Sequence, residues 1–309
     1  MKKSVNKIIY LFFFLTTLFL FVFGLMTVLN RPEKLMTAIL KSGKGVNLPK
    51  SLTEAESEIS WLLFFNREDG DVYKGIGDYY YSQKKINLEK TAFYYEKAFE
   101  YNPQPYIDDF KKLVEVYDKL GEKKKKEDLI YFLTEMLIKR GSKNRNASEL
   151  AYFLADEKLK EKDYGKALDF LDRSLKTAHE PWVFCNLQPL PLLELDKETM
   201  ARFAEKLFPL NKDYLGCFYQ YYAKVFYLSG FREKAVETNP NAVLFWLGSG
   251  DFYLKNQEFE KAKELFEACL KYSPDKKTDC QKGLQMAIDK NSSGFNKDFE
   301  KLIKGTPDF

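Results

Sequence analysis

The chain has 309 residues, of which 45% are apolar and 30% are charged, so its composition is neither that of a disordered chain nor that of a collagen. Its 49 Lys and Arg against 45 Asp and Glu give a net charge of +4. Residues 1–50 hold eight basic residues and one acidic residue, which leaves 41 basic and 44 acidic residues in 51–309. That body lacks the basic surplus of a nucleic-acid-binding protein. A single histidine, His179, excludes most zinc sites and most base-catalysed mechanisms.

Residues 8–29 carry no charge and are almost entirely apolar. As a helix they would be roughly 33 Å long, enough to cross a hydrocarbon core of about 30 Å. A cleaved signal peptide is the alternative, but its apolar region usually runs only about 7–15 residues before a small-x-small site. The exit at 26–31 offers no such site. The sequence therefore predicts an uncleaved transmembrane anchor over 1–30.

The charges around this span leave its orientation nearly balanced. Three lysines precede it, which favours a cytoplasmic N-terminus, but four basic residues follow it closely. The four cysteines, all in the body, favour disulfides outside the cytoplasm. Cys269 with Cys280 is the better pair, and Cys185 with Cys217 the weaker one. Four free thiols in a cytosolic body remain the alternative. We predict a single-pass membrane protein whose helical part is extracytoplasmic (periplasmic), with the cytoplasmic side left open.

The rest of the sequence predicts helices joined by short polar turns. Residues 31–50, with their Gly, Pro and Lys, form a predicted juxtamembrane linker. A Thr53-Glu-Ala-Glu56 capping box and apolar residues at helical spacing predict a leading helix within 51–68. From there to the end no strand alternation is evident, and helices of about 12–15 residues are expected.

A repeated pattern is clearest in 243–274. The residues that carry it are Trp246, Gly250, Tyr253, Phe259, Ala262, Phe266 and Pro274. This spacing resembles the tetratricopeptide repeat (TPR), a pair of helices of about 34 residues. In that reading Gly250 and Ala262 allow close helix packing, Phe266 fills the gap between the helices, and Pro274 ends the second helix.

Small residues mark the same crossing in earlier repeats: Ala167, Ala201 and Ala235 are each 34 residues apart. In the middle unit Pro189 and Pro191 should break the first helix, and Pro240 should shorten the second helix of the next one. The resemblance covers 69–274 and implies an all-α fold, an α-α superhelical solenoid after the transmembrane helix. Residues 275–309 would supply capping helices, at 275–290 and 295–304.

No motif carries recognisable chemistry. Gly75-Ile-Gly77 lacks a third glycine and a preceding strand, so it does not predict a dinucleotide site. Asp69-Gly-Asp71 is better explained by helix capping than by metal binding. His179 lies beside Glu180 and Pro181 at a predicted helix end. We predict no enzyme, no catalytic residue, no cofactor and no metal.

The family resemblance implies that the first helix of each pair lines a concave face that binds a protein or peptide partner. Helical register places the following residues on that face: Lys74, Asp78, Tyr81, Lys111, Glu115, Asp118, Tyr152, Asp156, Leu159, Gln220, Lys224, Tyr227, Leu247, Asp251 and Leu254. The predicted function is a membrane-anchored scaffold or adaptor in a bacterial cell envelope. A structural subunit of a permanent envelope assembly (pilus, secretion, cytochrome-maturation or polysaccharide machinery) is the alternative, and an enzyme with an unrecognised site comes last.

Overall fold

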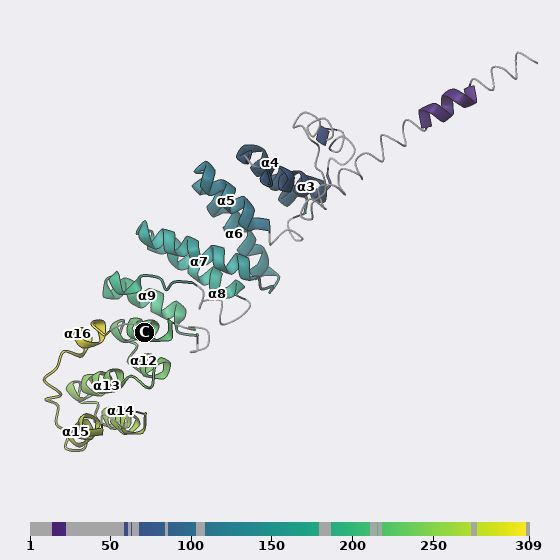
Figure 1. Ribbon diagram of the computed structural model, residues 1–309. Helices are drawn as coiled ribbons and strands as arrows, with labels where there is room; N and C mark the ends of the chain where they lie inside the picture. Colours follow the sequence, from purple (N-terminus) through teal and green to yellow (C-terminus); the bar gives the residue numbers. More distant parts are fainter. Residues whose placement is uncertain are drawn as a thin grey trace, which may run out of the picture. The chain divides into compact units, whose positions relative to one another are not determined.

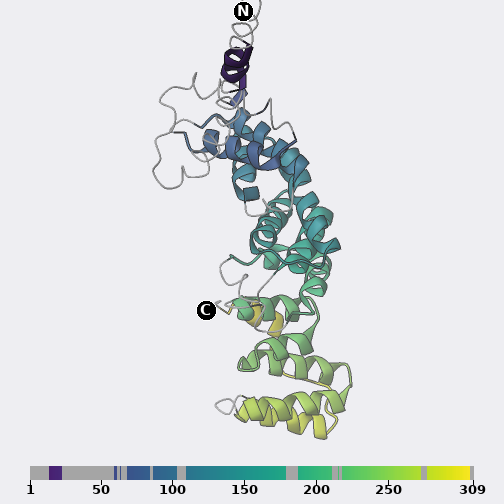
Figure 2. The same cartoon turned by 90° about the vertical axis from the view of Figure 1, so that its right-hand side faces the viewer.

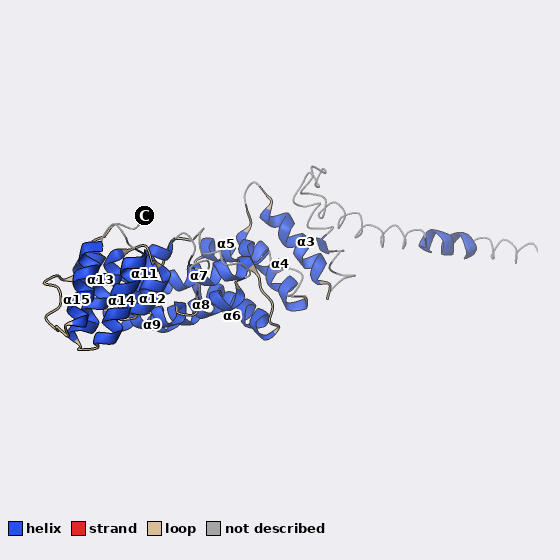
Figure 3. Cartoon of the chain, turned by 90° about the horizontal axis from the view of Figure 1, so that it is seen from below, coloured by secondary structure: helices blue, strands red, loops and turns tan. Residues whose placement is uncertain are grey.

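The structure is a computed structural model that describes residues 14–22, 59–60, 63, 68–83, 86–102, 109–178, 187–210, 215, 218–272 and 277–306. These residues contain helices and no strand, which confirms the predicted all-α class (Figures 1 and 3). Residues 14–22 are helical. Within the described residues no helix is both long and apolar enough to cross a membrane. The rest of the predicted anchor, the linker 31–50 and most of 51–68 lie outside the described residues.

The chain divides into two compact units, 1–129 and 130–309. The sequence had predicted one continuous array, and this boundary falls inside a helix rather than at a turn. In unit 1 the described helices are α3 (Gly70–Tyr81), α4 (Leu88–Tyr101), α5 (Phe110–Leu120) and the start of α6 (Lys123–Lys139).

Helices α3 and α4 form a pair whose contact depends on Gly77. A Cβ added there would lie 2.8 Å from Cδ1 of the buried Tyr95 ring, so only glycine lets the two helices approach this closely. Asp69 caps α3 by accepting a hydrogen bond from the amide of Asp71, as the capping interpretation predicts. The ring of Phe110, on α5, stacks on that of Phe99, on α4, at 4.1 Å between centroids.

Unit 2 repeats the helix pair three times. Its elements after α6 are α7 (Arg145–Lys160), α8 (Tyr164–Thr177), a 3-10 turn η4 (Leu192–Glu194), α9 (Lys197–Leu207), α11 (Tyr219–Leu228), α12 (Arg232–Thr238), α13 (Val243–Lys255), α14 (Phe259–Tyr272), α15 (Lys277–Ile288) and α16 (Phe299–Lys304). Helix α7 pairs with α8, α11 with α12, and α13 with α14 (Figure 2). This is the architecture that the TPR resemblance implies.

The proline positions act as predicted. Residues 188–191, which contain Pro189 and Pro191, are not helical, so within the described residues 187–196 the only helical element before α9 is the short turn η4. Helix α12 has only seven residues and ends two residues before Pro240. Pro274 lies outside the described residues.

The C-terminal helices differ from each other in role. Helix α15 packs against α13 and α14, so it covers the last pair as expected of a capping helix. Helix α16 instead returns to α11 and α13, as Figures 1 and 2 show. The expectation that residues 295–304 close the far end is therefore wrong for α16. Phe266, fully buried, fills the space between Gly250 on α13 and Gly283 on α15.

Candidate functional site

The predicted inner-face residues all lie on the first helices of pairs: α3 and α5 in unit 1, and α7, α11 and α13 in unit 2. Their side chains fall into three groups. Those of unit 1 mostly bind one another, Tyr152 of α7 binds the backbone of a non-helical segment, and Lys224 and Asp251 of α11 and α13 bind the chain's own C-terminal residues.

In unit 1 the group centres on Asp78. Its carboxylate accepts hydrogen bonds from Lys74 at 2.7 Å, Lys112 at 2.6 Å and the Tyr95 hydroxyl at 2.6 Å. Burial opposes ionisation of Asp78, but these hydrogen bonds outweigh it and hold the pKa of the carboxyl below its usual value of 3.8. Asp109 accepts from the same two lysines, at 3.3 and 3.1 Å. These charges therefore satisfy one another within the unit.

The remaining predicted residues of unit 1 are also engaged or exposed. The Tyr81 hydroxyl donates to Glu115 at 2.6 Å, and Lys126 pairs with Asp118 at 2.7 Å. Lys111 is half-buried. None of these contacts requires a ligand, so unit 1 offers a polar, self-paired surface.

On α7 the structure gives Tyr152 a different part from the one predicted. Its side chain is 3% exposed, and its hydroxyl donates to the carbonyl of Gln188 at 2.9 Å and accepts from the amide of Leu190 at 3.1 Å. Tyr221, on α11, donates to the carbonyl of Leu190 at 2.6 Å and accepts from the amide of Leu193 at 3.3 Å. Two tyrosine hydroxyls thus bind the backbone of a segment that is non-helical at 188–191 and enters the turn η4 at Leu192. Sequence register missed Tyr221, although its position in a Tyr-rich helix was visible.

Asp156 borders a cavity beside this segment. The cavity has a volume of about 350 Å³ and is lined by Tyr152, Phe153, Asp156, Lys160, Leu187, Gln188, Pro189 and Pro191. Asp156 pairs with Lys160 at 2.5 Å, and Phe153 is 52% exposed. Leu159, by contrast, is buried. The α7 face therefore combines an exposed aromatic ring, an ion pair and a bound stretch of backbone.

Replacing Tyr152 by Phe removes only the hydroxyl that binds residues 188–190. We expect the amide of Leu190 to exchange with solvent at least about tenfold faster, since its hydrogen-bond acceptor is lost. Hydrogen exchange read at Leu190 by nuclear magnetic resonance measures this effect.

The matched control is Tyr164→Phe. Tyr164 is the first residue of α8, and its hydroxyl is not among the groups that bind this segment. It should leave the exchange at Leu190 unchanged. An unchanged rate in Tyr152→Phe as well would show that the hydroxyl does not fix the segment.

On α11 and α13 several predicted groove residues prove to be core. Tyr227 and Leu247 are each 2% exposed and Leu254 is fully buried, so they cannot contact a partner without unfolding. Burial raises the pKa of Tyr227 to about 12, which keeps its hydroxyl neutral. Helix α16 packs against α11 and α13, the two helices that carry these residues.

The polar residues of the same face bind those C-terminal residues. Lys224 donates to the carbonyl of Thr306, and buried Asp251 accepts from the amide of Phe295 and pairs with Lys255 at 2.7 Å. Gln220 and Lys224 also border a cavity of about 490 Å³, closed on other sides by the α12–α13 turn and by Ile303 and Thr306.

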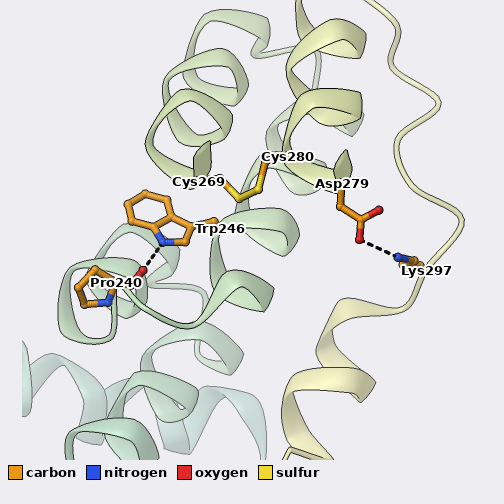
Figure 4. The surroundings of a disulfide bond; sticks show 6 residues. All are labelled: Pro240, Trp246, Cys269, Asp279, Cys280 and Lys297. Carbon is orange, nitrogen blue, oxygen red and sulfur yellow. Dashed lines mark hydrogen bonds and ion pairs between the residues drawn. A yellow bond between two sulfur atoms is a disulfide. The ribbon is translucent and has the colours of Figure 1, made fainter. Parts of the chain in front are cut away.

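The structure joins Cys269 and Cys280 by a disulfide between α14 and α15, the pair that the sequence favours (Figure 4). Beside it, the Trp246 indole donates to the carbonyl of Pro240 at 2.7 Å, and Lys297 pairs with Asp279 at 3.7 Å. His179, Cys185 and Cys217 lie outside the described residues. Among the residues that are described, no group of three His, Cys, Asp or Glu side chains could hold a metal.

Comparison with known proteins gives a likeness to solved structures only. No protein-family model and no curated protein matches the chain. Among solved structures, the crystal structure of yeast Tom70 aligns with 89% of this chain at 15% identity and a TM-score of 0.30. The chain spans 50% of the length of that Tom70 chain. A likeness at this level carries no argument, so the fold rests on the helix pairs described above.

Proposed function

We propose that this protein is a scaffold or adaptor that binds an extended segment of another protein along the first helices of its repeats. The observation that carries this proposal is the binding of residues 187–193 by the hydroxyls of Tyr152 and Tyr221. Hydrogen bonds to backbone groups do not depend on the partner's side chains, so they tolerate many sequences. Tyrosine also supplies a large contact area with little loss of side-chain entropy. Both hydroxyls are occupied by this segment, so a partner would bind beside it, at the cavity that the exposed Phe153 borders.

The partner segment proposed here is extended, with an apolar or proline side chain that enters the cavity bordered by Phe153 and Asp156. The chain's own Leu187–Pro191 segment already shows which chemistry fits this wall: apolar and proline side chains with their backbone turned to the tyrosines. The paired charges of Asp156 and Lys160 leave the cavity mouth close to neutral. A neutral, apolar segment is therefore favoured over a strongly charged one.

The proposal includes anchoring by residues 8–29 in a bacterial membrane, with the helical part outside the cytoplasm. The uncharged span of the sequence supports the anchor, and a disulfide between Cys269 and Cys280 fits an oxidising compartment. Anchoring confines both partners to one thin layer, so that even a weak groove can be occupied at a high local concentration.

Photo-crosslinking in intact membranes tests this function. A photoreactive amino acid replaces Phe153, and the adducts are identified by mass spectrometry. The matched control is Phe132 on α6, which is 50% exposed against 52% for Phe153. We expect a defined partner to be captured from position 153 and not from position 132. Equal capture at both positions, or none at 153, would contradict the proposal.

A second variant separates an adaptor from a permanent membrane subunit. Residues 8–29 are replaced by an unrelated apolar span of equal length while Phe153 keeps the crosslinker. An adaptor should retain its adduct, because the span serves only as an anchor. Loss of the adduct would favour the alternative in which the native span is itself a buried contact.

A further inference from the structure

The chain's C-terminal residues lie on the inner face of the last two helix pairs. After α15, residues 289–298 run back along the unit, and α16 packs against α13 and α11 (Figures 1 and 2). Phe299 and Ile303, one helical turn apart, are 5% and 1% exposed, whereas Leu302 is 45% exposed. Helix α16 therefore binds through one apolar edge, as a short amphipathic ligand does in a groove.

Two glycines leave room for this docking. A Cβ added to Gly248 on α13 would lie 2.9 Å from the Cβ of Phe299 and would overlap the Tyr227 hydroxyl. Gly294 has a φ of +65°, and a Cβ there would lie 2.5 Å from an Asp251 carboxylate oxygen. Both positions thus match the docked path of the segment, which indicates that the sequence is adapted to it.

Two polar contacts of the segment involve its backbone. The amide of Phe295 donates to Asp251, and the carbonyl of Thr306 accepts from Lys224. Asp251 and Lys224 are each at most 5% exposed. A charged side chain is costly to bury unless it is paired. Asp251 also pairs with Lys255, and the segment supplies backbone groups to both side chains.

One contact is poorly matched. The Arg232 guanidinium lies 3.8 Å from the centroid of the Phe252 ring, and it donates to Glu300 at the long distance of 3.4 Å. Its Nε is buried and has no hydrogen-bond partner within the described residues. Lys197 also reaches Glu300, at 3.6 Å, and Glu300 itself remains half exposed. An arginine fork can bind a carboxylate through two parallel hydrogen bonds, and Glu300 does not use this capacity.

We propose that the α11–α13 face is a second peptide-binding surface and that residues 294–306 occupy it as a built-in competitor. The partner that displaces them is a short amphipathic helix. It carries two apolar residues four positions apart and, beside the first, a carboxylate that pairs with Arg232 more closely than Glu300 does. This inference rests on the proposed function, since it assigns a partner to the same row of first helices.

The competition follows from the size of the segment. A helix of six residues is not stable alone in water, so α16 must melt when it leaves the face. While attached, it is held at a high effective concentration by its short connection to α15. A free peptide therefore binds the wild-type chain only through the fraction in which the segment has detached.

The test uses the full chain in detergent and a fluorescein-labelled peptide with the sequence of residues 294–306. Binding is measured by fluorescence anisotropy. We expect weak binding to wild type and binding tighter by about tenfold or more to the double variant Phe299→Ala, Ile303→Ala, in which the tethered segment is released. Adding Arg232→Gln to this double variant should weaken its binding of the peptide again.

A second release variant guards against misfolding. Gly294→Ala combines an unfavourable φ with a clash against Asp251, so it should also raise peptide affinity. The control is Gly141→Ala, whose φ of +61° imposes similar backbone strain but whose added Cβ meets nothing within 4 Å. Gly141→Ala should bind the peptide as weakly as wild type does. Circular dichroism verifies the helical content of every variant.

Three results would overturn the inference. Wild type and both folded release variants could bind the peptide equally weakly, or wild type could already bind it tightly. The molecular mass of a release variant could also double, which would place the released segment on a second copy of the chain. Failure of the proposed function is distinguishable, because crosslinking at Phe153 does not depend on α16. If that crosslink persists while peptide binding fails, only the competitor is lost.

Discussion

Replacing Phe266 by Ala is expected to lower the free energy of unfolding of unit 2 by about 3–5 kcal/mol. The ring is fully buried and occupies the space left by two glycines, Gly250 on α13 and Gly283 on α15. Truncation therefore leaves a cavity bordered by three helices, with no side chain on the facing glycines that could turn to fill it. Urea unfolding read by the fluorescence of Trp246, which stacks on Tyr272, measures the effect.

Because the chain has two compact units, its unfolding need not be two-state, and the signal must come from unit 2 alone. A background with Trp61→Phe and Trp182→Phe leaves Trp246 as the sole indole. Phe132→Ala serves as the control, since this ring is half exposed and its loss should change stability by about 0.5 kcal/mol or less. A loss below about 1 kcal/mol for Phe266→Ala would show that the core of the last repeat lies elsewhere.

The close contact between Gly250 and Phe266 is also the part of the fold that the sequence predicts best. Its information is local: both residues lie within one helix pair, and the requirement for a small residue opposite a large one is visible at helical spacing. The break caused by Pro189 and Pro191 is local in the same sense, because proline lacks the amide that a helix needs.

The candidate site was predicted less well, because burial on the inner face depends on residues far along the chain. Tyr227 and Leu247 have the right register for a groove, but both are buried, and α16 returns from more than fifty residues away to pack against their helices. Nothing near either residue signals that return. The most useful signal was Gly294, a glycine in a polar loop just before an amphipathic stretch, which indicates a turn directed back toward the protein.

The backbone-binding role of Tyr152 and Tyr221 has the same origin. Helical register identified a tyrosine on the inner face, but it could not show that the non-helical residues 188–190 would lie against that tyrosine. The division inside α6 was likewise hidden, because a continuous helical pattern crosses it.

Breaking the disulfide between Cys269 and Cys280 is expected to cost unit 2 about 3 kcal/mol of stability. The bridge closes a short loop, with a sequence separation of 11, and a loop of this length restricts the unfolded chain by about that amount. The variant is Cys269→Ser, Cys280→Ser in a background with Cys185→Ser and Cys217→Ser. Urea unfolding read by Trp246 compares it with the four-cysteine chain and with the background alone.

The same cysteines give a test of compartment that does not depend on stability. The disulfide blocks both sulfurs even in denatured protein, so a maleimide reagent added to denatured, unreduced protein from cells should not label the background chain. Labelling after reduction, with none before it, is expected if the helical part reaches an oxidising space, because disulfides persist there and are rare in the cytosol. Complete labelling before reduction would place reduced thiols on α14 and α15 and contradict the extracytoplasmic proposal. In that case the chain should show no difference in unfolding between the reduced and untreated forms, so the stability and labelling measurements must agree.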